Sequence, residues 1–185
     1  MTYAGEDSLI MTTPPEIRPM LTIEGEEDLI DIHFDMVAAY HGQSALAMLA
    51  VTFQALRLML PALSPQRPLR RSELTVISGH PGPGVRDAFE FVTRAVTRGV
   101  YTVDRSLPHA RLCPGADMSY SWRVSAGEQT VGVALRPGVV PERFFELIGR
   151  GAARSDEENA ELSALKRSVA DDVLAASPDA LFDRL

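Results

Sequence analysis

The chain has 185 residues, of which 45% are hydrophobic and 23% are charged, and its formal net charge is −7. This balance is typical of a soluble globular protein, and the acidic charge argues against a nucleic-acid-binding protein, which would present clustered positive charge to phosphate. The single cysteine, Cys113, excludes an internal disulfide and a cysteine-rich zinc finger.

The first part of the chain shows no targeting signal. Residues 1–20 contain three prolines and no hydrophobic period, so we expect a flexible N-terminal arm. The acidic segment 21–32 is expected to form a short helix or turn. The start has no basic region followed by an apolar run, and the apolar stretch at 45–60 is interrupted by polar residues. We therefore predict neither a secretory signal nor a membrane span, and we expect a cytoplasmic protein.

Residues 34–63 have a helical pattern with one interruption. His41 and Gly42 break it, because glycine allows a turn, and Ser44 can cap the helix that follows. Apolar side chains cover most faces of that second part, which predicts a helix buried on nearly all sides.

A short strand is predicted at 73–78, followed by the Gly- and Pro-rich loop GHPGPG at 79–84. A second helix is predicted from about residue 85 to 98, with Gly99 as its stop signal. This order places His80 in a loop at the carboxyl end of a strand, which is a usual location for ligand sites.

The C-terminal half completes a mixed fold. Its pattern predicts a strand at 100–104, a hairpin from 118–125 and 130–135, a short helix at 141–148, and a charged helix at 155–175 that opens with a capping box of Ser155 and Glu158. The fold class is therefore α+β, with a small, mostly antiparallel sheet packed against two long core helices and a C-terminal helical arm. We divide the chain into an N-terminal arm (1–20), a core domain (21–150) and the C-terminal helical arm (151–185).

Several features occur in a characteristic order. His41-Gly42 precedes a long apolar helix, and the strand ELTVIS leads into a loop before Val85-Arg86-Asp87-Ala88 opens the second helix. A Thr- and Gly-containing turn at 93–99 follows, and the charged helix near the end closes in a Pro…Leu-Phe tail. In this order the chain resembles, from Asp35 to Phe182, the FmdE-like family of formylmethanofuran dehydrogenase proteins.

The resemblance implies an α+β domain, often dimeric, with a metal site. The family's ligands come from the His-Gly segment and from cysteines, one of them in the loop before the second helix. His41 is the plain match in this chain. At the cysteine positions the chain has Ala45, Gly84 and Ala95, so the thiolate ligands are absent.

Histidine nitrogens are the available substitutes. We predict a divalent metal site, Zn²⁺ or another ion, built from His33, His41 and His80, with His80 in place of the lost loop cysteine. Asp35 or Asp87 could add an oxygen ligand. The alternative is that these histidines cap a helix or bind loop carbonyls.

Three further residues are candidates for ligand binding, namely Arg86, Asp87 and Ser44. Arg86 could hold an anion beside the start of the second helix, where glycines expose backbone amides. The loop lacks the residues of the known phosphate-binding fingerprints, so a tight turn is the simpler interpretation. Ser119, Ser121 and the histidines form no recognisable triad, and a G-x-S-x-G motif is absent.

These features predict an FmdE-like metal-binding domain, expected to be a homodimer. Such a domain would bind a small ligand, or would be an accessory protein of a one-carbon or molybdenum/tungsten redox enzyme system; whether it is itself an enzyme stays open. The alternative is a metal-free relative that is a binding or assembly module. A third candidate is an anion-binding protein that uses Arg86 and the loop amides.

Overall fold

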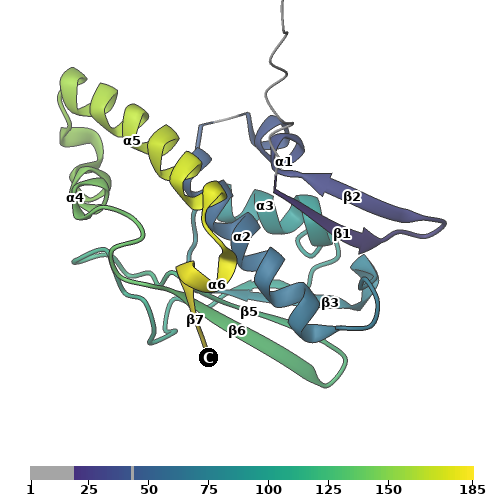
Figure 1. The fold of residues 1–185 in the computed structure, drawn as a ribbon. Coiled ribbons are helices and arrows are strands. Elements are labelled where there is room, and N and C mark those ends of the chain that lie inside the picture. Colours follow the sequence, from purple (N-terminus) through teal and green to yellow (C-terminus); the bar gives the residue numbers. More distant parts are fainter. Residues whose placement is uncertain (1–18, 43) are drawn as a thin grey trace, which may run out of the picture.

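The computed structural model describes residues 19–42 and 44–185 (Figure 1). The predicted arm at 1–20 falls almost entirely on residues 1–18, outside the described residues.

The α+β class is confirmed. The helices are α1 (Phe34–His41), α2 (Leu46–Leu63), α3 (Pro83–Thr93), α4 (Glu142–Arg150), α5 (Asp156–Ala175) and α6 (Pro178–Leu181), with 3₁₀ turns η1 (Arg71–Glu73) and η2 (Gly151–Ala153). The strands are β1 (Met20–Glu24), β2 (Leu29–His33), β3 (Leu74–Ser78), β4 (Tyr101–Val103), β5 (Ser121–Ala126), β6 (Gln129–Leu135) and β7 (Phe182–Arg184).

The larger sheet has five strands in the order β4-β3-β5-β6-β7. Only β3 and β4 are parallel, and α3 makes the crossover between them, as a parallel pair requires. The predicted hairpin is the β5–β6 pair. Strands β1 and β2 form a separate antiparallel hairpin beside the helices (Figure 1).

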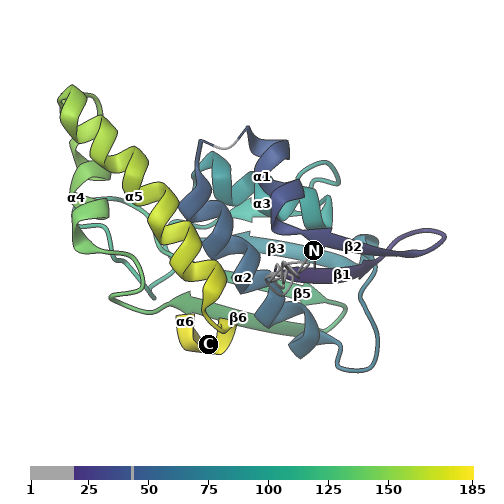
Figure 2. The ribbon, with the colours of Figure 1, turned by 45° about the horizontal axis from the view of Figure 1, so that its top comes forward.

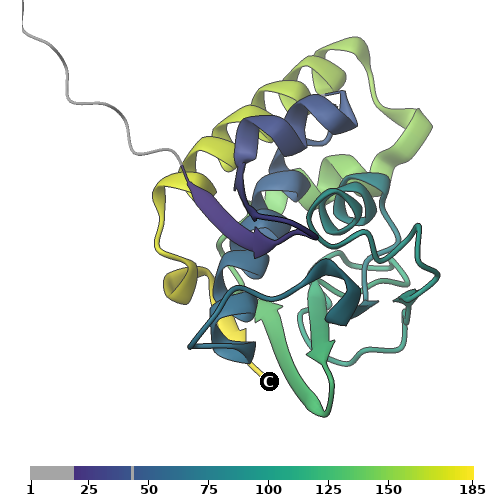
Figure 3. The same cartoon turned by 90° about the vertical axis from the view of Figure 1, so that its right-hand side faces the viewer.

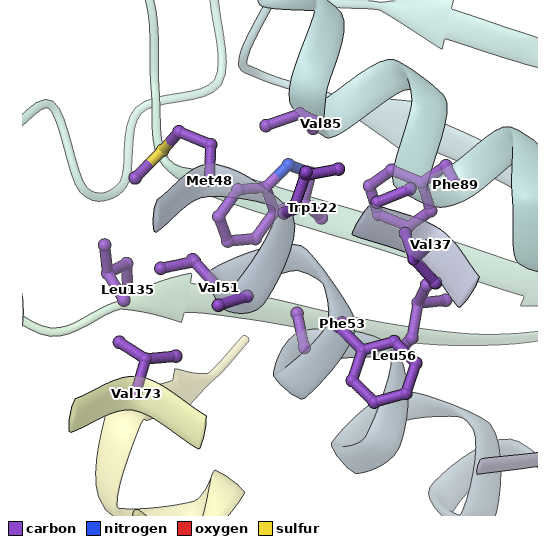
Figure 4. Packing of buried hydrophobic residues seen from close by; sticks show 14 of the residues in the cluster. Val37, Met48, Val51, Phe53, Leu56, Val85, Phe89, Trp122, Leu135 and Val173 are labelled. Atoms are coloured by element: carbon purple, nitrogen blue, oxygen red, sulfur yellow. The ribbon is translucent and has the colours of Figure 1, made fainter. Parts of the chain in front are cut away.

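Helix α2 is the centre of the core. It packs on β5 and β6, and also on α3 and α5 (Figure 2). Apolar side chains are therefore buried around nearly its whole circumference. The helices gather on one face of the five-stranded sheet (Figure 3). In close-up, Met48 and Val51 of α2 lie by Trp122 and Leu135 of the sheet, and Val173 of α5 is seen just below Leu135 (Figure 4).

Among the described residues, α2 is the one helix long and apolar enough to cross a membrane, and 78% of that span is buried inside the fold. This burial is expected for the core helix of a folded domain, which meets the same criteria of length and hydropathy.

A buried polar residue of α2 attaches the end of α5 to the core. The buried Gln54 donates from Nε2 to the carbonyls of Val173 (2.7 Å) and Ala176 (2.9 Å), and its Oε1 accepts from Arg57 (2.6 Å). The last carbonyls of a helix have no intrahelical donor, so Gln54 satisfies the end of α5. At the start of α5, the predicted capping box of Ser155 and Glu158 is present.

Two local expectations are wrong. Segment 21–32 is a hairpin because its buried residues alternate, as in Leu21 and Ile23 of β1, and this two-residue period is that of a strand. Helix α3 ends at Thr93 instead of near residue 98, because Arg94 adopts a left-handed conformation (φ 56°) and the chain turns there.

Candidate functional site

The starts of α2 and α3 touch. Ala45 is the N-cap of α2 and Gly84 is the second residue of α3, and a Cβ added at Gly84 would lie 2.6 Å from the Cβ of Ala45. The two helices can approach this closely only because position 84 has no side chain. Positions 45 and 84 are two of the three at which the resemblance implies cysteines.

This contact predicts a compensating pair of substitutions. Gly84→Ala is expected to lower the free energy of unfolding by about 1–3 kcal/mol, because the Ala45 methyl group is fixed to the backbone and cannot yield easily. Ala45→Gly in the same chain should recover most of that loss, since one methyl group then occupies the gap. A double-mutant cycle by urea denaturation measures the coupling, and additive effects of the two substitutions would contradict the close contact.

Three side chains are linked beside this junction. His41, the last residue of α1, has Nδ1 2.8 Å from Oδ2 of Asp87 on α3, and Oγ of Ser44 lies 3.2 Å from its Nε2. Gly42, with φ of 82°, ends α1 and turns the chain so that Ser44 comes back to the ring. A serine, a histidine and an aspartate are thereby joined in one hydrogen-bonded chain.

The chemistry of the partners fixes the direction of these bonds. An ionised carboxylate only accepts, so Nδ1 of His41 donates to Asp87, and in the neutral ring Nε2 accepts from the Ser44 hydroxyl. The His41 side chain is only 7% exposed, that of Asp87 is 27% exposed, and Ser44 is on the surface. The histidine is thus held in position, and the hydroxyl that it faces is accessible to a ligand.

Ser44 does not cap α2 as the sequence predicts. Ala45 is the N-cap, and no side chain among the described residues caps that end. The first backbone N–H groups of a helix have no intrahelical acceptor, and the helix dipole favours negative charge there. Free N–H donors therefore begin two residues after Ser44.

His80 lies in a different setting. It is buried, its ring is 4.9 Å from that of Tyr120, and its Nδ1 accepts from the Gly82 N–H (2.9 Å). Burial lowers the pKa of His80 to about 4, so the ring is neutral at pH 7. It lines a cavity of ≈ 430 Å³ whose wall also includes Met48 of the first turn of α2 and Gly82, the N-cap of α3.

His33 is the exposed N-cap residue of α1 and borders another cavity, beside Arg57 and the end of α5. The predicted metal ligands His33, His41 and His80 thus have different surroundings. Within residues 19–42 and 44–185, no three His, Cys, Asp or Glu side chains are grouped so that they could hold a metal ion.

The donor set that the resemblance implies is therefore not matched. Ala45, Gly84 and Ala95 offer no side-chain ligand, and Cys113 is buried near the Phe145 carbonyl, with its pKa raised by that burial. The metal site of His33, His41 and His80 stays a prediction.

Of the predicted ligand-binding residues, Ser44 and Asp87 come together on His41, while Arg86 is exposed on α3 and its backbone N–H bonds the Gly82 carbonyl. The sequence predicts each of these residues as a candidate for a site, but not the hydrogen bonds that link them. The three-residue spacing of His41 and Ser44 across a glycine is the one local signal of it.

No protein-family model matches the sequence, and no curated protein matches it with significant similarity. The resemblance to FmdE-like proteins stays an expectation based on the order of the motifs.

Proposed function

We propose that this chain is an FmdE-like enzyme whose substrate is a small carbonyl compound. Ser44 is the nucleophile, His41 is the general base, and Asp87 orients the imidazole ring of His41. The observation that carries the proposal is the hydrogen-bonded chain from Ser44 through His41 to Asp87. A nucleophile bonded to a base that is itself held by a third group is the arrangement of acyl-transfer catalysis.

The proposed reaction is ester or thioester hydrolysis in two steps. Oγ of Ser44 attacks the carbonyl carbon and its proton passes to Nε2 of His41, which then protonates the leaving group. In the second step, His41 takes a proton from water, and the water oxygen attacks the acyl group on Ser44. The acid is then released, and His41 returns the proton to Oγ of Ser44. The uncapped N–H groups at the start of α2 are the donors for the oxyanion of each step.

The cavity lined by His80 is the proposed site for the apolar part of the substrate. Met118, Phe144 and Ile148 supply apolar walls, and the cavity borders the starts of both helices at the junction. Its ≈ 430 Å³ volume is in the range of small-molecule sites.

The resemblance supports the same location. Two of its cysteine positions, Ala45 and Gly84, adjoin at the junction, and His41 is the family match. Since the thiolates are absent, the proposal has no step through a metal. It differs from the metal-free alternative predicted from the sequence, which is a binding or assembly module. The expected homodimer and cytoplasmic location stay predictions.

A fluorophosphonate probe and p-nitrophenyl acetate test the proposal. The untagged protein is expected to take up one probe molecule per chain, measured by intact mass, and Ser44→Ala is expected to take up none. Asp87→Asn should slow p-nitrophenyl acetate hydrolysis by roughly 10³- to 10⁴-fold, because the ring loses its orientation and tautomer.

Ser168→Ala, which removes an exposed serine on α5, is the matched control and should behave as the unsubstituted protein. If Ser44→Ala reacts as fast as the unsubstituted protein, Ser44 is not the nucleophile. Metal analysis of the same sample, with zinc titration, separates this proposal from the metal prediction. Near-stoichiometric zinc that is lost in a His41→Ala, His80→Ala variant would favour the metal site.

A further inference from the structure

A cavity of ≈ 470 Å³ lies at the C-terminal end of α3, between the tip of the β1–β2 hairpin, η1 and the segment that follows α3. Its lining gathers four arginines from two parts of a chain with net charge −7. They are Arg70, Arg71, Arg94 and Arg98, and the acidic lining residues are Glu24 and Glu26.

Two of these guanidinium groups are fixed by carbonyls. Arg71 donates to the Val92 and Phe91 carbonyls at the end of α3 (2.9 and 3.1 Å), and Arg98 donates to the Ser72 carbonyl (2.9 Å). Neither has a carboxylate partner within the part of the chain that the structure describes, and Nε of Arg98 is buried with no partner. Their positive charges are therefore held in place without an ion pair.

The other two arginines keep donors available to a ligand. Arg94 has a side chain 52% exposed, and its ion pair with Glu90 is long at 3.9 Å. Arg70 donates from Nε to Glu24 (2.8 Å), which also pairs with Arg67, and the Arg70 side chain is 58% exposed.

The arginines also oppose one another. Burial first, and then the charge of Arg94, lower the pKa of Arg71, while the charge of Glu90 raises it. Arg94 moreover occupies a left-handed backbone position (φ 56°) after α3, where glycine is the usual residue. The repulsion between like charges held together costs free energy that a bound anion would offset.

We propose that this cavity binds a small molecule through a phosphate or diphosphate group. The planar fork of arginine matches phosphate oxygens in pairs, and the four arginines outnumber the two glutamates of the lining. The phosphate site does not involve Ser44. A failed test of phosphate binding therefore does not bear on the proposed hydrolase activity, and the reverse also holds.

Calorimetric titration of the full chain with pyrophosphate, at low ionic strength, tests the proposal. One site per chain is expected, and Arg94→Gly should weaken binding by about tenfold or more, the effect of one charge-assisted contact. Glycine also relieves the left-handed strain, so the melting temperature of this variant should not fall. Loss of binding would then not arise from loss of folding.

Two matched controls isolate the charge. Arg184→Gln removes an arginine that is as exposed as Arg70 (58% each) and also has one ion pair, so it should keep full affinity while Arg70→Gln loses it. Ala110→Gly relieves the other left-handed non-glycine position and should leave binding unchanged. The proposal is overturned if pyrophosphate does not bind, if Arg94→Gly binds as tightly as the unsubstituted protein, or if citrate binds equally well.

Discussion

Acidification from pH 7 to pH 4 is expected to lower the free energy of unfolding by about 3 kcal/mol through His80 alone. The pKa of this histidine is about 4 in the folded protein, against 6.5 as its ordinary value. The unfolded chain therefore takes up a proton between pH 6.5 and 4 that the folded protein does not, and stability falls over that window. Well above pH 6.5, where the ring is neutral in both states, the effect vanishes.

The structural reason is that protonation would place a charge inside the fold and disrupt a hydrogen bond. Nδ1 of His80 accepts from the Gly82 N–H, so a proton on this atom would oppose a donor. His80→Asn keeps an acceptor that can reach the same N–H but does not titrate. Urea denaturation at pH 7 and pH 4 should show a fall smaller by about 3 kcal/mol in the variant. Equal falls would mean that His80 titrates normally.

Glu90→Leu is expected to lower the free energy of unfolding by about 2–3 kcal/mol. The buried Glu90 side chain accepts from the N–H groups of Val96 (2.8 Å) and Thr97 (3.1 Å) and from the Thr97 hydroxyl. Leucine fills the space but leaves these donors unpaired.

Glu90→Gln is the matched variant, because its amide oxygen can still accept from both N–H groups. Its loss should be about 1 kcal/mol, measured by urea denaturation at pH 7. If leucine is tolerated as well as glutamine, the turn after α3 does not depend on these bonds.

Strong periodic patterns predicted most of the fold. The break at Gly42 and the all-round apolar surface of α2 are local properties of the sequence, and so is the capping box of Ser155. The residue at which α3 ends cannot be read from its hydrophobic period, which continues beyond Thr93. Glu90 accepts hydrogen bonds from N–H groups six and seven residues later, and these bonds stabilise a turn there. In the β1–β2 hairpin, the many acidic residues made the two-residue alternation of buried and exposed side chains hard to recognise in the sequence.

The residues of the candidate site could be predicted from the sequence, but their hydrogen-bonded arrangement could not. The sequence predicts His41 as a metal ligand, and it predicts Ser44 and Asp87 as ligand-binding residues. Asp87 is 46 residues from His41 along the chain, and only the packing of α3 on α1 brings their side chains together. His80 lies next to glycine and proline, much as His41 lies next to Gly42, but its ring contacts that of Tyr120.

The position of α2 within the sequence has a consequence for biosynthesis. This helix is translated before α5, which covers one side of it and begins only at Asp156, and β7 completes the sheet later still. Until α5 has been made, the apolar side of α2 that α5 covers in the folded protein has no partner helix on it. We therefore expect this protein to depend on chaperones during translation and to aggregate when its C-terminal segment is truncated.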